Sequence, residues 1–160
     1  MRFPAEQFRR APWVLLVAIC CLALAACRTT PPPVVDFSEP GWTPRAGQAV
    51  WRPRAGQPDV AGELLVAANA DGRWWIEFSK PPLPLVVVMR DTAGWRLKST
   101  IHGEFKGRGT PPGHTAWLVL ADCLAAKMPP RGWAFTAREG GAWELANAAT
   151  GESLRGFLAP

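Results

Sequence analysis

From Val60 to the end of the chain, apolar segments of five to eight residues alternate with turn signals, and this spacing constrains the fold more than any other feature. Within residues 73–79, Trp74, Ile76 and Phe78 share one face of an extended chain. Short segments of this kind are typical of neighbouring antiparallel strands. We therefore expect strands at residues 48–52, 63–68, 73–79, 85–89, 95–102, 103–109, 133–138, 142–147 and 153–158.

One amphipathic helix interrupts these strands. The positions i, i+3, i+4 and i+7 are occupied by Trp117, Leu120, Ala121 and Leu124; Met128 continues the stripe and two prolines end it. The expected fold class is mainly β, a curved antiparallel sheet of seven to nine strands that forms an open, unclosed barrel with one helix. Either side chains and the helix fill the concave face, or it keeps a cavity for a ligand.

The first 26 residues have the composition of an export signal. Arg2, Arg9 and Arg10 precede an uncharged apolar run that starts near Trp13 and ends in small residues. The run is shorter than the roughly 20 residues that a transmembrane helix needs. We expect residues 1–26 to be a signal peptide.

The end of this run, Leu24-Ala25-Ala26-Cys27, resembles the lipobox of bacterial lipoproteins. The resemblance implies a diacylglyceryl thioether on Cys27, cleavage before it, and acylation of the new amino group, as with palmitate. Several acyl chains together make a stable anchor. Two alternatives stay open, namely ordinary secretory cleavage after Ala23-Leu24-Ala25 and an uncut anchor.

The mature chain is expected to hold a tether and a single domain. Residues 27–47 form the acylated N-terminus and a Pro-rich tether, in which Pro31-Pro32-Pro33 favours an extended conformation. Residues 48–160 form the β-rich domain. The segments starting at Trp42 and Trp51 are near-duplicates, which suggests a local repeat of a strand edge and turn.

The net charge and the cysteine content further limit the partners and the disulfides that the protein can have. Three arginines and one glutamate are lost with the signal peptide, which lowers the formal net charge from +5 to +3. This mildly basic charge suits anionic lipid head groups. Nucleic acid is not an expected partner of an exported protein. Cys20 and Cys21 leave with the signal and Cys27 is acylated, so Cys123 has no partner for a disulfide. Its place in an apolar helix indicates a buried structural thiol.

No motif for a known chemistry is present. The sequence lacks G-x-S-x-G, H-E-x-x-H, paired C-x-x-C and phosphate-loop patterns. His102 and His114 have no spacing that pre-positions a metal site, and carboxylates such as Glu77 and Glu104 are typical of a solvated surface. We therefore predict a protein that is not an enzyme and has no catalytic residue, metal or cofactor.

Two groups of side chains are candidates for binding. The apolar candidates to face a ligand are Trp74, Ile76, Phe78, Trp95, Leu97, Trp117, Trp133 and Trp143. For the tryptophans the default interpretation is the hydrophobic core. The candidate contacts to anionic head groups are Arg96, Lys98, Lys106 and Arg108, which otherwise form the solvated face of an amphipathic sheet.

With these features the chain resembles the outer-membrane lipoprotein localisation factors, the LolA/LolB-like fold. The shared features are a lipidated Cys27, a Pro-rich lead, an antiparallel meander rich in Trp and Leu, and a helix around residues 117–128. The resemblance covers residues 60–160 and is architectural. It implies an unclosed barrel whose concave apolar face, covered by helices, accepts the acyl chains of lipoproteins.

The expected function is that of a membrane-anchored, periplasm-facing, non-enzymatic lipoprotein that binds acyl chains or another apolar ligand on a concave sheet face. Arg28 stands where an Asp would favour retention in the inner membrane, so the expected location is the outer membrane. The alternative is a structural or assembly lipoprotein that binds another envelope protein through a sheet edge or the duplicate around Trp42 and Trp51. Candidate partners are thus the membrane, lipid or lipoprotein acyl chains, and an envelope protein.

Overall fold

The computed structural model describes residues 35–160, in which one antiparallel sheet carries one α-helix. The nine strands of this part are β1 (Trp42–Arg52), β2 (Val60–Asn69), β3 (Trp74–Lys80), β4 (Leu83–Arg90), β5 (Trp95–Ser99), β6 (Gly103–Gly107), β7 (Trp133–Ala137), β8 (Ala142–Asn147) and β9 (Ser153–Leu158). The helices are α2 (Ala116–Leu124) and the short 3-10 helix η2 (Glu139–Gly141). No helix within this range is long and apolar enough to span a bilayer. The expected fold class is confirmed.

The strand order is that of a barrel with one pairing missing. Across the sheet the order is β6-β5-β4-β3-β2-β1-β9-β8-β7. Consecutive strands pair except for β6 and β7, which form the two edges, and β9 also pairs with β1. Residues 108–132, which include α2, connect these edges. The chain thus follows an up-and-down meander that a helix-containing segment interrupts.

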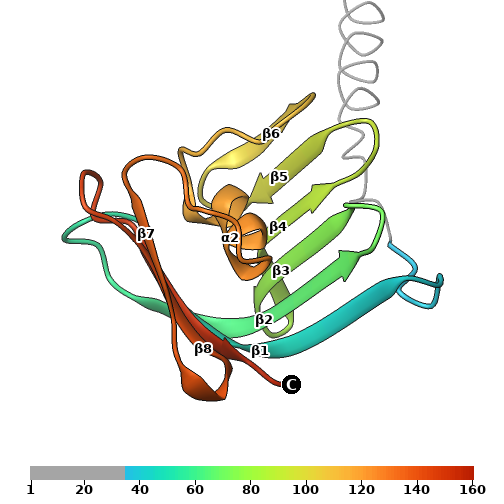
Figure 1. The fold of residues 1–160 in the computed structure, drawn as a ribbon. Helices are drawn as coiled ribbons and strands as arrows, with labels where there is room; N and C mark the ends of the chain where they lie inside the picture. Colours follow the sequence, from blue (N-terminus) through green and yellow to red (C-terminus); the bar gives the residue numbers. More distant parts are fainter. Residues whose placement is uncertain (1–34) are drawn as a thin grey trace, which may run out of the picture. The chain divides into compact units, whose positions relative to one another are not determined.

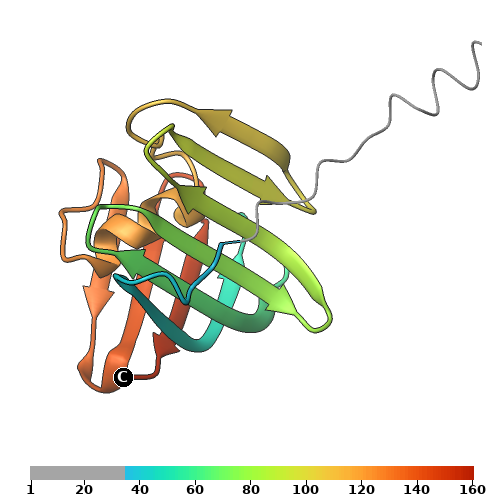
Figure 2. The same ribbon diagram turned by 90° about the vertical axis from the view of Figure 1, so that its right-hand side faces the viewer.

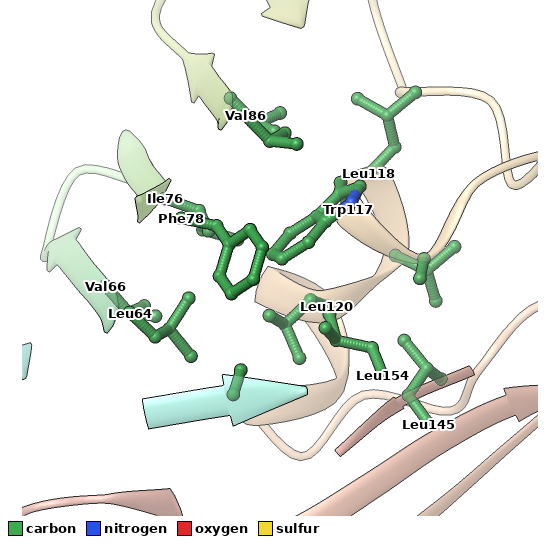
Figure 3. Packing of buried hydrophobic residues seen from close by; sticks show 14 of the residues in the cluster. Leu64, Val66, Ile76, Phe78, Val86, Trp117, Leu118, Leu120, Leu145 and Leu154 are labelled. Carbon is green, nitrogen blue, oxygen red and sulfur yellow. The ribbon is translucent and has the colours of Figure 1, made fainter. Parts of the chain in front are cut away.

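α2 lies on the inner face of the curved sheet, between the half formed by β3–β6 and the half formed by β7–β9 (Figures 1 and 2). Trp117 is fully buried, with its ring centroid 5.0 Å from that of Phe78 and 5.4 Å from that of Trp51. Figure 3 shows Trp117 and Leu120 pointing from α2 toward side chains of the sheet. The centre of the concave face is therefore filled.

The core around α2 follows from the alternation in the sequence, because every second residue of each strand points inward. The buried apolar residues of the strands are Ala49, Trp51, Leu64, Val66, Ala67, Trp74, Trp75, Ile76, Phe78, Val86, Val88, Leu97, Trp133, Trp143, Leu145, Leu154 and Leu158. Those of α2 are Ala116, Trp117, Leu118, Val119, Leu120 and Cys123. Apart from Ala67 and Trp75, which lie on the outer face, these residues form one cluster that holds the sheet and the helix together.

Glycine allows β1 and β9 to approach each other where the two halves of the sheet meet. A Cβ atom at Gly156 would collide with the backbone oxygen of Gln48, and one at Gly47 with that of Phe157. Any larger residue at these positions would push the strands apart.

The sheet begins earlier than the sequence predicted. β1 starts at Trp42, so residues 42–47, assigned above to the tether, are part of the sheet. The Phe37 ring packs edge-on against Trp42 and Trp75 on the outer face, with centroids 5.8 and 6.2 Å away. Pro44 is tolerated because residues 42–45 pair with β2 alone, which leaves one side of the strand free.

The predicted helix also ends early, at Leu124, and does not include Met128, which is 92% exposed. Ala126 adopts a left-handed conformation with φ 58°, and the Lys127 N–H donates to the Asp122 carbonyl oxygen. The Ala126 N–H donates to the Cys123 carbonyl oxygen. These two bonds form a Schellman motif, which usually requires glycine at the left-handed position. Because the sequence has alanine there, the stop was not predicted.

We expect Trp117→Ala to lower the free energy of unfolding by about 3–5 kcal/mol, because it leaves a cavity between α2 and the sheet. Urea unfolding followed by circular dichroism measures the change. Met128→Ala is the control and should change stability by less than about 0.5 kcal/mol, since its side chain is exposed. A loss below about 1 kcal/mol for Trp117→Ala would show that α2 does not hold the inner face.

Candidate functional site

The predicted ligand-facing side chains lie mainly in the hydrophobic core. Those that are buried are Trp74, Ile76, Phe78, Leu97, Trp117, Trp133 and Trp143, and Trp95 packs half-buried against them. Of the two alternatives left open, a filled concave face and a cavity for a ligand, the first holds at the centre of the sheet, because α2 occupies that space. For the tryptophans the core interpretation is confirmed. Leu97 and Trp143 also border the two hollows that remain, one near each end of α2.

The first hollow, called here the apolar groove, has a volume of about 460 Å³ and lies between the C-terminal end of α2 and strands β7–β9. Its lining residues are Arg45, Cys123, Leu124, Ala126, Lys127, Phe135, Ala137, Arg138, Gly141, Ala142, Trp143 and Leu158. A volume of this size is within the range of known ligand pockets, about 300–1,000 Å³.

The walls of the apolar groove are set by the strand register and by the end of the helix. Phe135 pairs with the inward-facing Leu145, so its side chain points to the inner face, where it is half-buried. The Schellman turn at Ala126 ends α2 and leaves this part of the face uncovered. The indole N–H of Trp143, a buried residue, has no hydrogen-bond partner among the described residues.

Three cations stand at the apolar groove. Arg45 donates from Nη2 to the Leu158 carbonyl oxygen at 3.3 Å. Lys127 pairs with Asp122 at 2.7 Å, and the exposed Arg138 pairs with Glu144 at 3.5 Å. Surface pairs such as the last two are weak, so these cations can also attract an anionic group at the mouth of the apolar groove.

Cys123 behaves as a structural thiol. It is 1% exposed, and burial raises its pKa to about 11. A thiol with a raised pKa is protonated at neutral pH and is a poor nucleophile. The expected buried thiol is confirmed.

The second hollow, called here the polar pocket, has a volume of about 240 Å³ and lies beside the N-terminal end of α2. Its lining residues are Pro53, Arg54, Leu97, His102, Phe105, His114, Thr115, Thr150 and Glu152. Both histidines of the chain therefore border one pocket, together with a glutamate and an arginine.

Glu152 is the central polar residue of this pocket and is 5% exposed. Its Oε1 accepts hydrogen bonds from Trp51 Nε1 at 3.2 Å, from Thr115 Oγ1 at 3.1 Å and from the Ala116 backbone N–H at 3.1 Å. Burial raises the pKa of the Glu152 carboxyl, while these bonds oppose the change. Glu152 thus links β1, the start of α2 and the start of β9.

His102 packs edge-on against Trp51, with 5.7 Å between the ring centroids. Burial, with a smaller effect of Arg54, lowers the pKa of His102, so the imidazole is neutral at physiological pH. No group of three or more His, Cys, Asp or Glu side chains within residues 35–160 is arranged to hold a metal ion.

Sequence reasoning missed Arg54 and Glu152 as pocket residues. Each lies in or next to a turn with no motif around it, and they are almost a hundred positions apart. Their neighbourhood is created by the backbone bond from the Ala55 N–H to the Thr150 carbonyl oxygen, which joins two loops. No local sequence signal indicates such a contact.

The candidate head-group contacts lie elsewhere. Arg96 and Lys98 alternate with the inward-facing Leu97 on β5, so they point to the outer face, where Arg96 pairs with Lys106 in register. Arg108 is exposed just after β6. Three of these cations thus share the outer face near the β6 edge, and none of the four lines the apolar groove.

A wider hollow of about 610 Å³ is lined by residues of β1, β2, β8 and β9. Three of its four charged lining residues are already paired, Arg138 with Glu144 at 3.5 Å and Arg155 with Asp59, which lies outside the lining, at 3.0 Å. Because most of its charged residues already have a partner at the surface, this hollow indicates no particular ligand.

Comparison with known proteins assigns no function to any of these hollows. No model of a known protein family matches the chain, and no curated protein matches it. What the chain does has to follow from its own residues and geometry.

We expect the stability difference between wild type and Glu152→Gln to depend on pH. The pKa of Glu152 is higher in the folded than in the unfolded chain, so its contribution is fully present below the ordinary value of 4.5 and is lost as pH rises through the folded-state pKa. Glutamine keeps an acceptor oxygen and does not ionise in this range. Urea unfolding at a series of pH values should therefore show that the free energy of unfolding of the variant rises relative to that of wild type as the pH approaches neutrality. If the free energies of unfolding of the two proteins changed with pH in the same way, a raised pKa of the Glu152 carboxyl would be contradicted.

Proposed function

We propose that this chain is a lipid-anchored, periplasm-facing protein of the outer membrane that binds the acyl chain of an amphiphile and is not an enzyme. The anchor is the acylated Cys27 expected from the sequence, which lies outside the described residues. The observation that carries the binding function is the apolar groove, a hollow whose lining combines apolar side chains with three cations.

The walls of the apolar groove suit a hydrocarbon chain. Leu124 and Phe135 are half-buried, and Trp143 and Leu158 are buried behind them. Each methylene group removed from water against such walls contributes about 0.8 kcal/mol. Because α2 fills the centre of the inner face, the proposed ligand lies beside the helix and not along the whole sheet.

The cations of the apolar groove favour an amphiphile with an anionic head. Arg45, Lys127 and Arg138 offer positive charge to a carboxylate or phosphate, while the acyl chain follows the apolar wall. A fatty acid has this combination of charge and apolar length. The lipid-binding part of the resemblance to lipoprotein localisation factors is thereby retained as a proposal, at a smaller site than an open barrel would offer.

The outer-face cations Arg96, Lys98, Lys106 and Arg108 are proposed as contacts to the membrane surface. Each Lys or Arg close to anionic lipid contributes about 1 kcal/mol to attraction. Glu104 lies 3.7 Å from Arg96 and reduces the local charge. This contact would assist the acyl anchor and would not replace it.

A second candidate function is binding to another envelope protein through the β6 edge. Phe105 on β6 is 44% exposed and Ile101, just before it, is 54% exposed. An edge strand with free backbone groups and apolar side chains can add a strand from a partner. Cross-linking in cells distinguishes the two functions, because recovery of one stoichiometric protein partner favours this alternative.

We expect Cys27→Ala to abolish palmitate labelling and to move the protein from the detergent phase to the aqueous phase. The reason is that the acyl chains supply the membrane affinity. Cys123→Ala is the matched control and should keep both properties, since its thiol is buried. Labelling that persists in Cys27→Ala would contradict the proposed anchor.

We expect Phe135→Glu to weaken binding of a fluorescent fatty acid at least about tenfold, because it places a negative charge in the apolar wall. The matched control is Phe157→Glu, since Phe157 is 45% exposed and alternates with the inward-facing Leu158. Fluorescence titration measures the affinity, and thermal unfolding shows that both variants fold. Equal affinity in Phe135→Glu, or the absence of lipid from gently purified wild type by mass spectrometry, would contradict the proposal.

A further inference from the structure

We propose that the polar pocket binds a small zwitterion, a free amino acid with an ammonium and a carboxylate group. This site is separate from the apolar groove and does not depend on it. The two hollows lie near opposite ends of α2 and share no lining residue. The inference rests on the charges, the unused hydrogen-bonding capacity and the size of the pocket.

The ammonium group is matched by Glu152. All three hydrogen bonds to its carboxyl reach Oε1, and Oε2 receives none from the described residues. Glu152 also forms no ion pair within this part of the chain, although its side chain borders the pocket. A buried carboxylate without a cation is unfavourable, and a ligand ammonium would supply both the missing donor and the charge.

The carboxylate group is matched by Arg54. Arg54 lines the same pocket as Glu152 and His102. Arg54 and Glu152 nevertheless form no ion pair with each other. Two opposite charges that border one pocket without meeting suit a ligand that carries one charge of each sign. An amine alone would meet the repulsion of Arg54, and a carboxylate alone that of Glu152.

The remaining walls select the kind of amino acid. Pro53, Leu97 and Phe105 give the pocket an apolar side, which favours an aliphatic side chain. The imidazole of His102 is neutral at physiological pH and adds hydrogen-bonding capacity without further charge. A volume of about 240 Å³ is below the range of drug-sized pockets. The pocket therefore fits one amino acid and not a longer peptide.

The test is calorimetric titration of the detergent-solubilised full-length protein with leucine and two analogues that each lack one charge. Isoamylamine has the leucine skeleton without the carboxylate, and 4-methylpentanoate has it without the ammonium. We expect leucine to bind and each analogue to bind at least about tenfold more weakly. The proposal is overturned if leucine does not bind at millimolar concentration, or if either analogue binds as well as leucine.

Variants locate the site. Arg54→Gln and Glu152→Gln should each weaken leucine binding at least about tenfold, and Arg131→Gln, an exposed arginine outside the pocket, should leave it unchanged. Arg54 is exposed, so its replacement tests the site even if Glu152→Gln disturbs folding. Full leucine affinity in Arg54→Gln would overturn the proposal. Fatty-acid binding in the same variants reports on the apolar groove separately.

Discussion

Burial of the Trp117 ring attaches α2 to the sheet, and the rest of the inner face is arranged around this contact. Removing about 200 Å² of mostly apolar surface from water contributes about 5 kcal/mol. The indole N–H has no partner in the described part of the chain, which costs about 1–3 kcal/mol. Packing therefore outweighs the lost hydrogen bond. Glu152 fixes the direction of the helix, because its Oε1 binds both Trp51 of β1 and the first backbone N–H of α2.

The position of α2 explains why the inner face has two hollows of different chemistry. At its N-terminal end the helix meets loops, and loops bring polar side chains such as His102 and His114 to the polar pocket. At its C-terminal end the helix stops over strands. The inward-facing side chains of these strands are apolar, and they form the walls of the apolar groove. One nine-residue helix thus divides a single concave face into a polar and an apolar site.

Most of the fold is predictable from the sequence, because inward and outward residues alternate along nearly every strand and turn residues separate them. The start of β1 and the end of α2 were missed because each depends on a tertiary contact or an unusual residue, namely Phe37 packing on Trp75 and Ala126 in a left-handed turn. The candidate sites were hardly predictable. Leu97 and Trp143 were nominated, whereas Arg54 and Glu152 meet only through long-range contacts between loops, which leave no local pattern.

The open sheet and its two hollows have the same cause. A closed up-and-down meander would pair β6 with β7, but the segment between them contains α2, which lies inside the sheet. The strands that remain as edges are short, five residues each, and β6 carries the charged Glu104 and Lys106 on either side of the exposed Phe105. The polar pocket and the apolar groove lie near the two ends of this helix. An insertion that prevents closure thereby creates the places where a ligand can enter.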